Sequence, residues 1–421
     1  MSFSTRPLGE VARLLSGGTP RKSNPAYWQG PIPWLTPKDM GRWENQTEAH
    51  VSEQAIGNGT RLAPANASFI AVRGMSLHNE IRVISCSRSI TFNQDIKAVV
   101  AGPGLDDGFL YYALTAAKPT LLNSVCAAGH GTGVLATDRL LALPIPAVPV
   151  QTQRAIAKFF GDIDDKIELN RQMNETLEAQ ARALFRDWFV EFGPVEAKMA
   201  GDAPYLAPDL WSLFPNRLAD DGIPEGWRTY RLNEMADHHT KSLKPMDAAS
   251  EVFEHFSLPA YDSGQQPVLE VGGGIKSNKT IVPNGAILLS KLNPEIPRVW
   301  WPQNKGAHRQ IASTEFLAFT AKSGISPALL YSLFSDQTFR QRLEGMVTGT
   351  SKSHQRVSPP ALRSLGVLAG DAQVFTAFGQ IVTSLMQKVL VNRAENHTLA
   401  QTRDLLLPKL MSGEIRVRES G

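Results

Sequence analysis

One eight-residue phrase occurs twice in this chain of 421 residues. NRQMNETL at residues 170–177 returns 222 residues later as NRAENHTL at 392–399, with five of the eight positions identical. A second echo, LGEVA at 8–12 and LNEMA at 232–236, lies 224 positions apart. Self-similarity at a long period indicates a duplicated structural unit. The chain is therefore predicted to consist of two related halves.

Each copy of the phrase lies in a long heptad pattern. Alternating steps of four and three residues meet mostly apolar side chains from Ile156 to Trp188, and again from Phe378 to Leu410, where Arg403 is the one charged residue. A seam sustained over about four heptads is typical of a coiled coil. Each half is thus predicted to be a globular unit followed by one long helix.

Two asparagines stand at the centre of each seam, Asn170 and Asn174 in the first and Asn392 and Asn396 in the second. They are either exposed positions slightly misassigned to the seam, or buried polar residues that fix the register of the helices. If the helices pack antiparallel, Asn170 faces Asn396 and Asn174 faces Asn392. A register shifted by one heptad would leave amides facing hydrocarbon, at a cost on the order of a few kcal/mol. We therefore expect an antiparallel pair.

The globular parts are predicted to be mixed α/β, because short β-rich runs alternate with glycine, proline and asparagine. The clearest of these runs are 68–74, 96–101, 286–292 and 315–321. A chain of this length is expected to form two domains plus connectors. The fold class is thus α/β, with two globular α/β domains related by the internal repeat and separated by two long antiparallel coiled-coil helices.

The predicted domain organisation follows the repeat. It places a first globular domain at 1–150, a spacer helix at 151–192, a linker and second globular domain at 193–371, and a C-terminal spacer helix and tail at 372–421. The stretch 192–208 is rich in proline, glycine and alanine and is expected to link the halves. The start of the second helix is less defined, since 368–373 reads LAGDAQ where the first half has IPAVPVQTQ.

A search for catalytic motifs finds none. The sequence contains no phosphate loop, no GxGxxG after a strand and no HExxH. His238 and His239 are adjacent, which disfavours a metal site and suggests polar loop residues. The single Pro-Pro pair is followed by Ala361 rather than by the aromatic residue that an amino-methyltransferase motif needs. The chain is predicted to be non-catalytic, with no metal and no cofactor of its own.

Cysteine usage and hydropathy bear on the compartment. Cys86 and Cys126 are the only two cysteines and fit no metal-ligand spacing. The two could form a disulfide with each other, but so few cysteines in so long a chain indicate a reducing compartment. No signal peptide and no run of 18 apolar residues is found, so no membrane partner is expected and the predicted location is the cytoplasm.

Recognition is the remaining class of function. The net charge of +3 is compatible with a nucleic-acid partner but is too small to indicate one. Arginine, lysine and glutamine in loops can contact bases or phosphates. Most such residues are ordinary surface charge when taken singly, but the clusters recur in both halves. The candidates for DNA contact are Arg21, Lys22, Lys38, Arg73, Arg82 and Arg88 in the first half, and Lys276, Lys279, Lys291, Arg298, Lys352, Gln355 and Arg356 in the second.

The chain resembles the specificity subunits of type I restriction-modification systems over essentially its whole length. The resemblance is carried by LGEVARLLSGGTP at 8–20, by LPIPAVPVQTQRAIAKFF and the helix after it at 143–185, by VTGTSKSHQRVSPPALRSLGV at 347–367, and by LLLPKLMSGEI at 405–415. It implies two target-recognition domains, each reading one half of a split sequence in double-stranded DNA, and helices that act as a spacer.

The resemblance also implies partners. Two modification subunits, docked on the helical regions near 156–190 and 378–412, would methylate adenine with S-adenosylmethionine. Restriction subunits would cleave and translocate DNA with ATP and Mg.

The seam of 33 residues from Ile156 to Trp188 would run roughly 50 Å, or about 15 base pairs, as a ruler between half-sites. Because the halves differ most in their globular parts, we expect an asymmetric target.

Two rival interpretations are weighed against this one. A self-contained nuclease or methyltransferase with cryptic motifs would modify DNA alone. A coiled-coil scaffold would bind DNA weakly and without sequence preference, and would leave the basic clusters unexplained.

Overall fold

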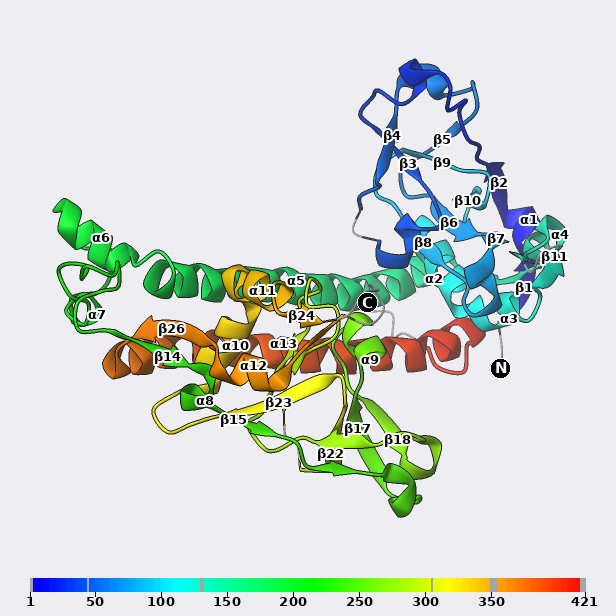
Figure 1. Ribbon diagram of the computed structural model, residues 1–421. Coiled ribbons are helices and arrows are strands. Elements are labelled where there is room, and N and C mark those ends of the chain that lie inside the picture. Colours follow the sequence, from blue (N-terminus) through cyan, green and yellow to red (C-terminus); the bar gives the residue numbers. More distant parts are fainter. Residues whose placement is uncertain (1–2, 44, 129–131, 304–305, 349–354, 417–421) are drawn as a thin grey trace. The chain divides into compact units, whose positions relative to one another are not determined.

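The computed structural model describes residues 3–43, 45–128, 132–303, 306–348 and 355–416 (Figure 1). The chain divides into two compact units. Unit 1 comprises residues 1–169 and 395–421, and unit 2 comprises residues 170–394. Two long helices, α5 (Val150–Phe189) and α13 (Ala372–Ser412), each contribute residues to both units.

Unit 1 is built on two four-stranded sheets. The first has the order β2-β10-β6-β8 and is antiparallel, and the second has the order β4-β3-β9-β5 with a parallel pair, β3 and β9. The strands of the first sheet are β2 (Ala12–Ser16), β10 (Ile96–Ala101), β6 (Ser68–Ala71) and β8 (Val83–Ser85). Those of the second are β4 (Ala49–Val51), β3 (Ile32–Leu35), β9 (Ile90–Phe92) and β5 (Arg61–Ala63).

Short ladders and helices complete unit 1. One ladder pairs β1 with β13, and a small sheet has the order β11-β12-β7. Their bounds are β1 (Thr5–Pro7), β13 (Pro144–Pro146), β11 (Cys126–Ala128), β12 (Thr132–Val134) and β7 (Arg73–Gly74). The helices are α1 (Leu8–Val11), α2 (Asp107–Ala116), α3 (Lys118–Leu122) and α4 (Thr137–Leu141).

Unit 2 repeats this arrangement with one strand more. Its sheets have the orders β15-β23-β20-β21 and β16-β19-β22-β17-β18, and the second again holds one parallel pair, β17 and β22. The strands are β15 (Ala236–His239), β23 (Phe316–Ala321), β20 (Ile287–Ser290), β21 (Val299–Trp300), β16 (Ser242–Leu243), β19 (Lys279–Ile281), β22 (Arg309–Ser313), β17 (Val252–Phe256) and β18 (Val268–Val271).

The ladders and helices of unit 2 also follow the order seen in unit 1. Two short ladders pair β14 with β26 and β24 with β25, with bounds β14 (Arg228–Arg231), β26 (Gly366–Gly370), β24 (Val347–Thr348) and β25 (Arg356–Val357). The helices are α8 (Leu232–Met235), α9 (Leu258–Asp262), α10 (Pro327–Ser335), α11 (Gln337–Glu344) and α12 (Pro359–Ser364). The internal repeat predicted from the sequence is thus a repeat of topology.

The predicted strands are confirmed at β6, β10, β20 and β23, each within two residues of a β-rich run except that the first run divides at Val72 into β6 and β7. A short helix and strand precede each long helix, α4 and β13 before α5, and α12 and β26 before α13. The entry to the second long helix, which the sequence left open, is at Ala372.

The heptad seam is confirmed by burial. Ile156, Phe160 and Trp188 on α5, and Phe378 and Val382 on α13, are at most 1% exposed. Within unit 2 the helices run antiparallel, because Phe185 contacts Phe378 and Phe189 contacts Phe375 at ring-centroid distances of 5.9 and 5.7 Å.

The central asparagines are part of this packing. In unit 2 the Asn392 amide donates to the Asn174 carbonyl oxygen over 2.9 Å, as predicted. In unit 1 the Asn396 amide donates to the Ile167 backbone carbonyl over 3.2 Å, and Arg403 pairs with Asp164, so these segments are also antiparallel. The predicted pairing of Asn170 with Asn396 stays a prediction.

The stretch expected to be a linker is folded instead. Residues 193–200 form α6 (Gly193–Ala200), with a proline in its first turn and Gly201 as a left-handed C-cap. Val195 is fully buried in the unit 2 core, and the Lys198 ammonium donates to the Phe214 carbonyl. Proline and glycine at opposite ends are ordinary helix boundaries, so the same composition is compatible with a short helix within a connecting stretch. A second short helix, α7 (Pro208–Trp211), follows.

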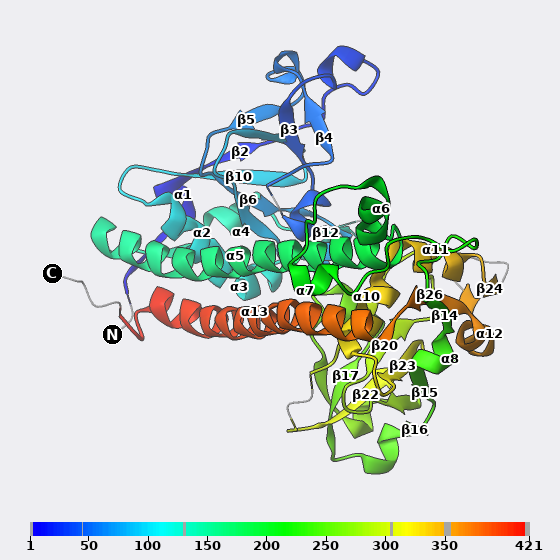
Figure 2. The ribbon, with the colours of Figure 1, turned by 90° about the vertical axis from the view of Figure 1, so that its left-hand side faces the viewer.

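Helix α13 is more apolar than was expected from the sequence, in which no run of 18 apolar residues was found. By length and composition it is one helix apolar enough to cross a membrane, although 44% of its most apolar window is buried inside the protein. Its apolar residues Val374, Phe375, Phe378 and Val382 belong to the unit 2 core. Figure 2 shows α13 running alongside α5. A core helix of this kind has the same composition as a membrane span, because both bury apolar side chains.

Candidate nucleic-acid interface

The SGGTP segment of unit 1 forms a tightly packed turn after β2. A Cβ on Gly17 would lie 2.3 Å from the backbone oxygens of Asn93 and Phe92, so only glycine fits there. The Trp34 indole donates to the Gly18 carbonyl over 3.0 Å, and the Thr19 hydroxyl donates to the side-chain oxygen of Gln94 over 2.6 Å. These contacts hold the backbone that leads to the first basic pair.

Arg21 and Lys22 extend from this rigid turn into solvent. The Trp28 indole donates to the Arg21 carbonyl over 3.3 Å, and the Trp28 and Trp34 rings meet edge to face at 5.1 Å. Both basic side chains are exposed, and neither has a hydrogen bond or ion pair within the described part of the chain. A fixed backbone with uncommitted cationic side chains is what a phosphate or base contact requires.

Lys38 lies in a loop that Asp39 organises. The Asp39 carboxylate accepts hydrogen bonds from the Thr36 backbone at 2.7 Å, from the Thr36 hydroxyl at 2.6 Å and from the Glu48 backbone at 3.0 Å. The Lys38 ammonium pairs with Glu48 at 2.6 Å, and this contact raises the pKa of Lys38. Both side chains are mostly exposed, so the pair is weak and easily exchanged for a phosphate.

Arg82 and Arg88 brace the same loop. Arg82 donates to the Pro37 carbonyl over 2.9 Å and pairs with Glu80, while Arg88 donates to the Asn45 carbonyl. The sequence predicted DNA contact for both residues. The structure gives each a partner within unit 1, so contact with DNA would have to compete with these bonds.

Arg73 occupies the short strand β7. It is exposed and lies opposite Val134 of β12 in the ladder. Among the residues that the structure describes, its side chain has no polar partner, so Arg73 joins Arg21 and Lys22 as an uncommitted cation of unit 1.

Two arginines of unit 2 are held by carboxylates. Arg298 makes a two-bond contact with Asp262 at 2.7 and 2.8 Å, and its side chain is only 11% exposed. Arg356 contacts Glu315 in the same way, at 2.9 and 3.0 Å. Such fork-like pairs are among the stronger side-chain contacts, so both residues stabilise the unit.

Lys279 has a side-chain hydrogen-bond partner within unit 2, whereas Lys276 has none among the described residues. Lys279 is 7% exposed on β19, its ammonium donates to the Ser277 hydroxyl over 2.6 Å, and burial lowers its pKa. Lys276 stands exposed three residues earlier with no side-chain partner in the described chain. Lys352 lies outside the residues that the structure describes.

Three unit 2 candidates are brought together by backbone pairing. The Lys291 amide donates to the Glu315 carbonyl over 2.9 Å, and the Lys291 carbonyl accepts from Val357 over 3.0 Å. The Asn293 amide donates to the Gln355 carbonyl over 3.1 Å. Lys291 therefore lies beside Gln355 and Arg356, next to β25, although it precedes Gln355 by 64 positions in the sequence.

The sequence-based list of cations did not include His238 or Arg363. The charges of Arg363 and of the candidate Lys291 both act on His238. His238 is on strand β15, not in a loop as expected, and its ring packs against Phe319 at 5.0 Å. Burial, followed by the nearby charges of Arg363, His239 and Lys291, lowers the pKa of His238. The sequence contains no strand signal here, because ADHH does not alternate and two adjacent histidines resemble a polar turn.

No metal site emerges among the residues that the structure describes, because no three of their histidine, cysteine, aspartate or glutamate side chains gather closely enough. The candidate interface thus consists of two separate sets of cations. The uncommitted ones are Arg21, Lys22 and Arg73 in unit 1 and Lys276 in unit 2, with Lys291 half-buried. Their contact with DNA remains a prediction.

Comparison with known proteins gives a consistent result. The family model for the type I restriction modification DNA specificity domain matches residues 2–179. The chain is 25% identical over 432 aligned residues to the type I restriction enzyme MjaIX specificity subunit of Methanocaldococcus jannaschii, covering 99% of this chain and 94% of that one. It is 29% identical over 162 residues to the EcoR124I/EcoR124II specificity subunit of Escherichia coli, covering 38% and 40%.

The fold also matches a solved structure. The crystal structure of the type I restriction-modification S subunit from M. genitalium aligns over 98% of this chain and 96% of that chain, with a TM-score of 0.58 and 15% sequence identity. At this identity the match supports the fold: two globular units and long helices.

Proposed function

We propose that this chain, which belongs to the family of type I restriction-modification specificity subunits, recognises a split DNA target with one half-site for each globular unit. The observation that carries the proposal is the repeat of topology. The two units share their strand orders, and the second sheet of each contains a parallel pair, β3 with β9 in unit 1 and β17 with β22 in unit 2. The two units nevertheless expose different cations to solvent. A duplicated reader with divergent side chains is suited to two half-sites of different sequence.

The asymmetry is visible at equivalent ladder positions. Arg73 faces Val134 in unit 1, whereas the equivalent bridge in unit 2 joins Leu292 to Arg356. The positive charge has thus moved to the opposite strand. Direct readout depends on which side chain reaches a base edge, so this exchange supports an asymmetric target.

The chemistry would belong to partners. Two modification subunits would methylate adenine with S-adenosylmethionine, and restriction subunits would use ATP and Mg for cleavage and translocation. This chain would position the DNA and contribute no reacting group. α5 and α13 would serve as the spacer and as docking helices, and the location would be the cytoplasm.

Methylation mapping tests the proposal in a host that carries the chain with its cognate modification subunit. A split, asymmetric motif with methylated adenine, lost when the chain is deleted, is the expected result. Unchanged methylation after deletion would overturn the specificity role. Inserting one heptad into both helices should lengthen the gap between half-sites, and an unchanged gap would refute the ruler.

A second assay separates the rival interpretations. Purified chain is incubated with DNA, Mg²⁺ and a methyl donor, and we expect neither cleavage nor methyl transfer. A reaction by the chain alone would favour a self-contained enzyme, and binding without sequence preference would favour a scaffold.

A further inference from the structure

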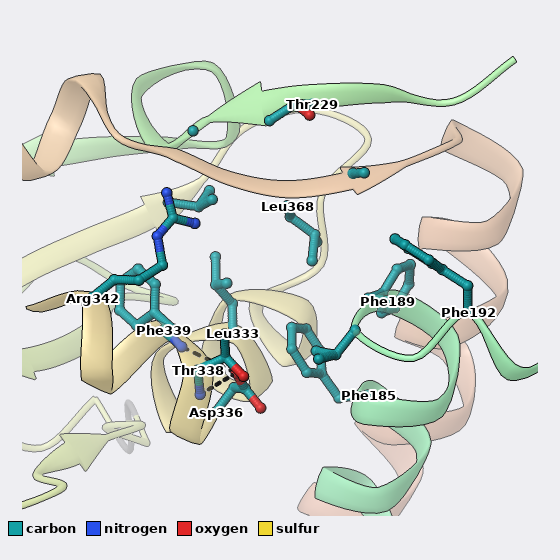
Figure 3. A pocket seen from close by; sticks show the side chains of 14 residues that line it. Phe185, Phe189, Phe192, Thr229, Leu333, Asp336, Thr338, Phe339, Arg342 and Leu368 are labelled. Atoms are coloured by element: carbon teal, nitrogen blue, oxygen red, sulfur yellow. Dashed lines mark hydrogen bonds between the residues drawn. The ribbon is translucent and has the colours of Figure 1, made fainter. Parts of the chain in front are cut away.

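Two adjoining hollows of about 270 Å³ each open in unit 2, beside the C-terminal turns of α5. They share Phe185 and Asp336, so together they form one groove, which we call the α5–α11 groove. Figure 3 shows the first hollow, with Phe185, Phe189 and Phe192 on one side and Phe339 and Leu368 on the other. We call this first half the aromatic hollow and the second the Ser332 hollow.

The Ser332 hollow contains a buried hydroxyl without a partner. Ser332 is 3% exposed, and its hydroxyl makes no hydrogen bond within the described chain. A buried polar group left unsatisfied costs roughly 1–3 kcal/mol, so such a group is a candidate for ligand contact.

Unit 1 shows what fills the equivalent position. Ser332 is the sixth residue of α10, and Tyr112 is the sixth residue of α2. The Tyr112 hydroxyl donates to Asp164 of α5 over 2.7 Å, and Asp164 also pairs with Arg403. In unit 1 a tyrosine and a carboxylate thus fill the space from within. In unit 2 the serine is too short to do so.

The Ser332 hollow is lined by cations. Arg182, Arg186 and Arg340 border it. Arg182 lies 3.7 Å from Glu178, and Arg186 donates two hydrogen bonds to the exposed Glu191 at 3.2 and 2.7 Å.

Arg340 has no polar side-chain partner in the described chain. The one carboxylate in the hollow, Asp336, accepts from the backbone of Thr338 and Phe339 and so caps α11. The hollow therefore favours a negatively charged group.

The aromatic hollow decides the kind of ligand. Most of its lining side chains are phenylalanine, leucine and valine, and the polar ones are Thr229, Asp336, Thr338 and Arg342. DNA phosphates would satisfy the arginines but would leave this apolar surface uncovered. A protein segment with an aspartate or glutamate beside an aromatic or long aliphatic residue would fill both halves, as hot-spot side chains do in interfaces.

We propose that the α5–α11 groove docks such a segment of the modification subunit, with the carboxylate in the Ser332 hollow and the apolar side chain in the aromatic hollow. This inference rests on the proposed function, since it names the site on this chain for a partner that the function requires. It assigns this groove to one of the two modification subunits. The other would meet unit 1, where Tyr112 and Asp164 occupy the equivalent position, so its contact is predicted to lack such a hollow.

The test titrates the cognate modification subunit onto immobilised full-length chain. Ser332→Tyr fills the hollow as in unit 1, and Arg340→Glu reverses its charge. Each variant is expected to raise the Kd for the modification subunit about tenfold or more. Gln341→Glu, on the same helix but outside the groove, is the matched control and should leave the Kd unchanged. The thermal midpoint of each variant is measured in parallel. If Ser332→Tyr proves to be unfolded, the Kd of Arg340→Glu still tests the groove.

The outcomes separate the two proposals. If the unaltered chain binds the modification subunit and both variants bind equally well, the groove proposal is overturned and the specificity role stands. If Arg340→Glu weakens DNA binding but not subunit binding, the groove contacts phosphate instead, which also overturns the docking. If the unaltered chain fails to bind the modification subunit, the proposed function falls, and the groove proposal with it.

Discussion

The two units solve the same packing problem with different polar contacts. In unit 1, Asp164 of α5 accepts from Tyr112 and pairs with Arg403 of α13. In unit 2 the helices are joined by Asn174 with Asn392 and by Glu178 with Arg393 at 2.6 Å. The strand orders and the apolar seam are retained throughout. Topology is therefore fixed by the apolar pattern, while the polar contacts are exchangeable between units.

The second sheets of the two units, which contain β4 and β18, differ in the side chains that their edge strands expose. The edge strand of unit 2, β18, exposes Val268, Leu269 and Val271 by 45, 59 and 53%. The equivalent edge of unit 1, β4, buries Val51 and exposes His50. The two units thus differ in the apolar surface that these equivalent edge strands expose.

The largest difference between the units is expected at Gly17. Its backbone approach to Phe92 and Asn93 has no glycine counterpart in unit 2, where Lys241 takes the equivalent position. Gly17→Ala should therefore destabilise the protein by roughly 3 kcal/mol, because the new methyl group meets backbone oxygens that cannot move aside. Urea unfolding followed by tryptophan fluorescence measures the loss.

Gly161→Ala on α5 is the control for Gly17→Ala. A Cβ on Gly161 meets nothing within 4 Å, so the helix should gain roughly 0.5–1 kcal/mol from the better helix former. Equal stability of the two variants would show that the Gly17 turn is looser than its contacts imply.

The next effect is expected at the asparagine pair of unit 2. Asn392 is fully buried, so Asn392→Leu should cost roughly 1–3 kcal/mol because the Asn174 carbonyl oxygen loses its donor. Replacing both residues by leucine should recover most of the loss, since both amides of this buried pair are then removed together. Thermal unfolding of the two single variants and the double variant measures this recovery.

Asn396 of unit 1 provides the comparison for that pair. It is half-buried and bonds a backbone carbonyl, so Asn396→Leu should cost less than Asn392→Leu. A larger loss at Asn396 would mean that register is fixed chiefly in unit 1.

The seam and the strands could be predicted because their evidence is local. Heptad spacing and alternation are read from neighbours a few positions apart, and both predictions were confirmed. Which of the arginines and lysines pair with carboxylates could not be predicted in this way. Arg298 finds its carboxylate 36 positions away and Arg356 finds its own 41 positions away. Nothing in a loop sequence separates such a paired arginine from a free one like Arg21.

That distinction leads to the DNA-binding prediction. Arg21→Ala should lower DNA affinity about tenfold, or roughly 1.4 kcal/mol, and reduce the salt dependence by about one charge, with an unchanged thermal midpoint. Arg298→Ala should instead lower the midpoint, because the two bonds from Arg298 to Asp262 are lost. Binding to the target is measured at several salt concentrations on the complex with the modification subunit. A normal salt slope in Arg21→Ala would remove Arg21 from the interface.

The smallest effect is expected from the histidine that unit 1 lacks. His238 lies where unit 1 has Leu14, and its pKa is lowered by burial and nearby cations. A lowered folded pKa means that the unfolded state binds the proton more readily. Stability from this group is therefore present above the ordinary histidine pKa of about 6.5 and is lost as the pH falls towards the folded value.

The thermal midpoint of His238→Leu should consequently fall by less between about pH 7.5 and pH 5.5 than the midpoint of the unaltered chain does. Some acid sensitivity should remain, because His255 of the same unit is buried and its pKa is also lowered. His255 keeps its bond to Glu270 in this variant and serves as the internal reference. Identical acid curves for the two proteins would show that His238 titrates as it does in the unfolded chain, and that the replacement of Leu14 by histidine carries no electrostatic consequence for unit 2.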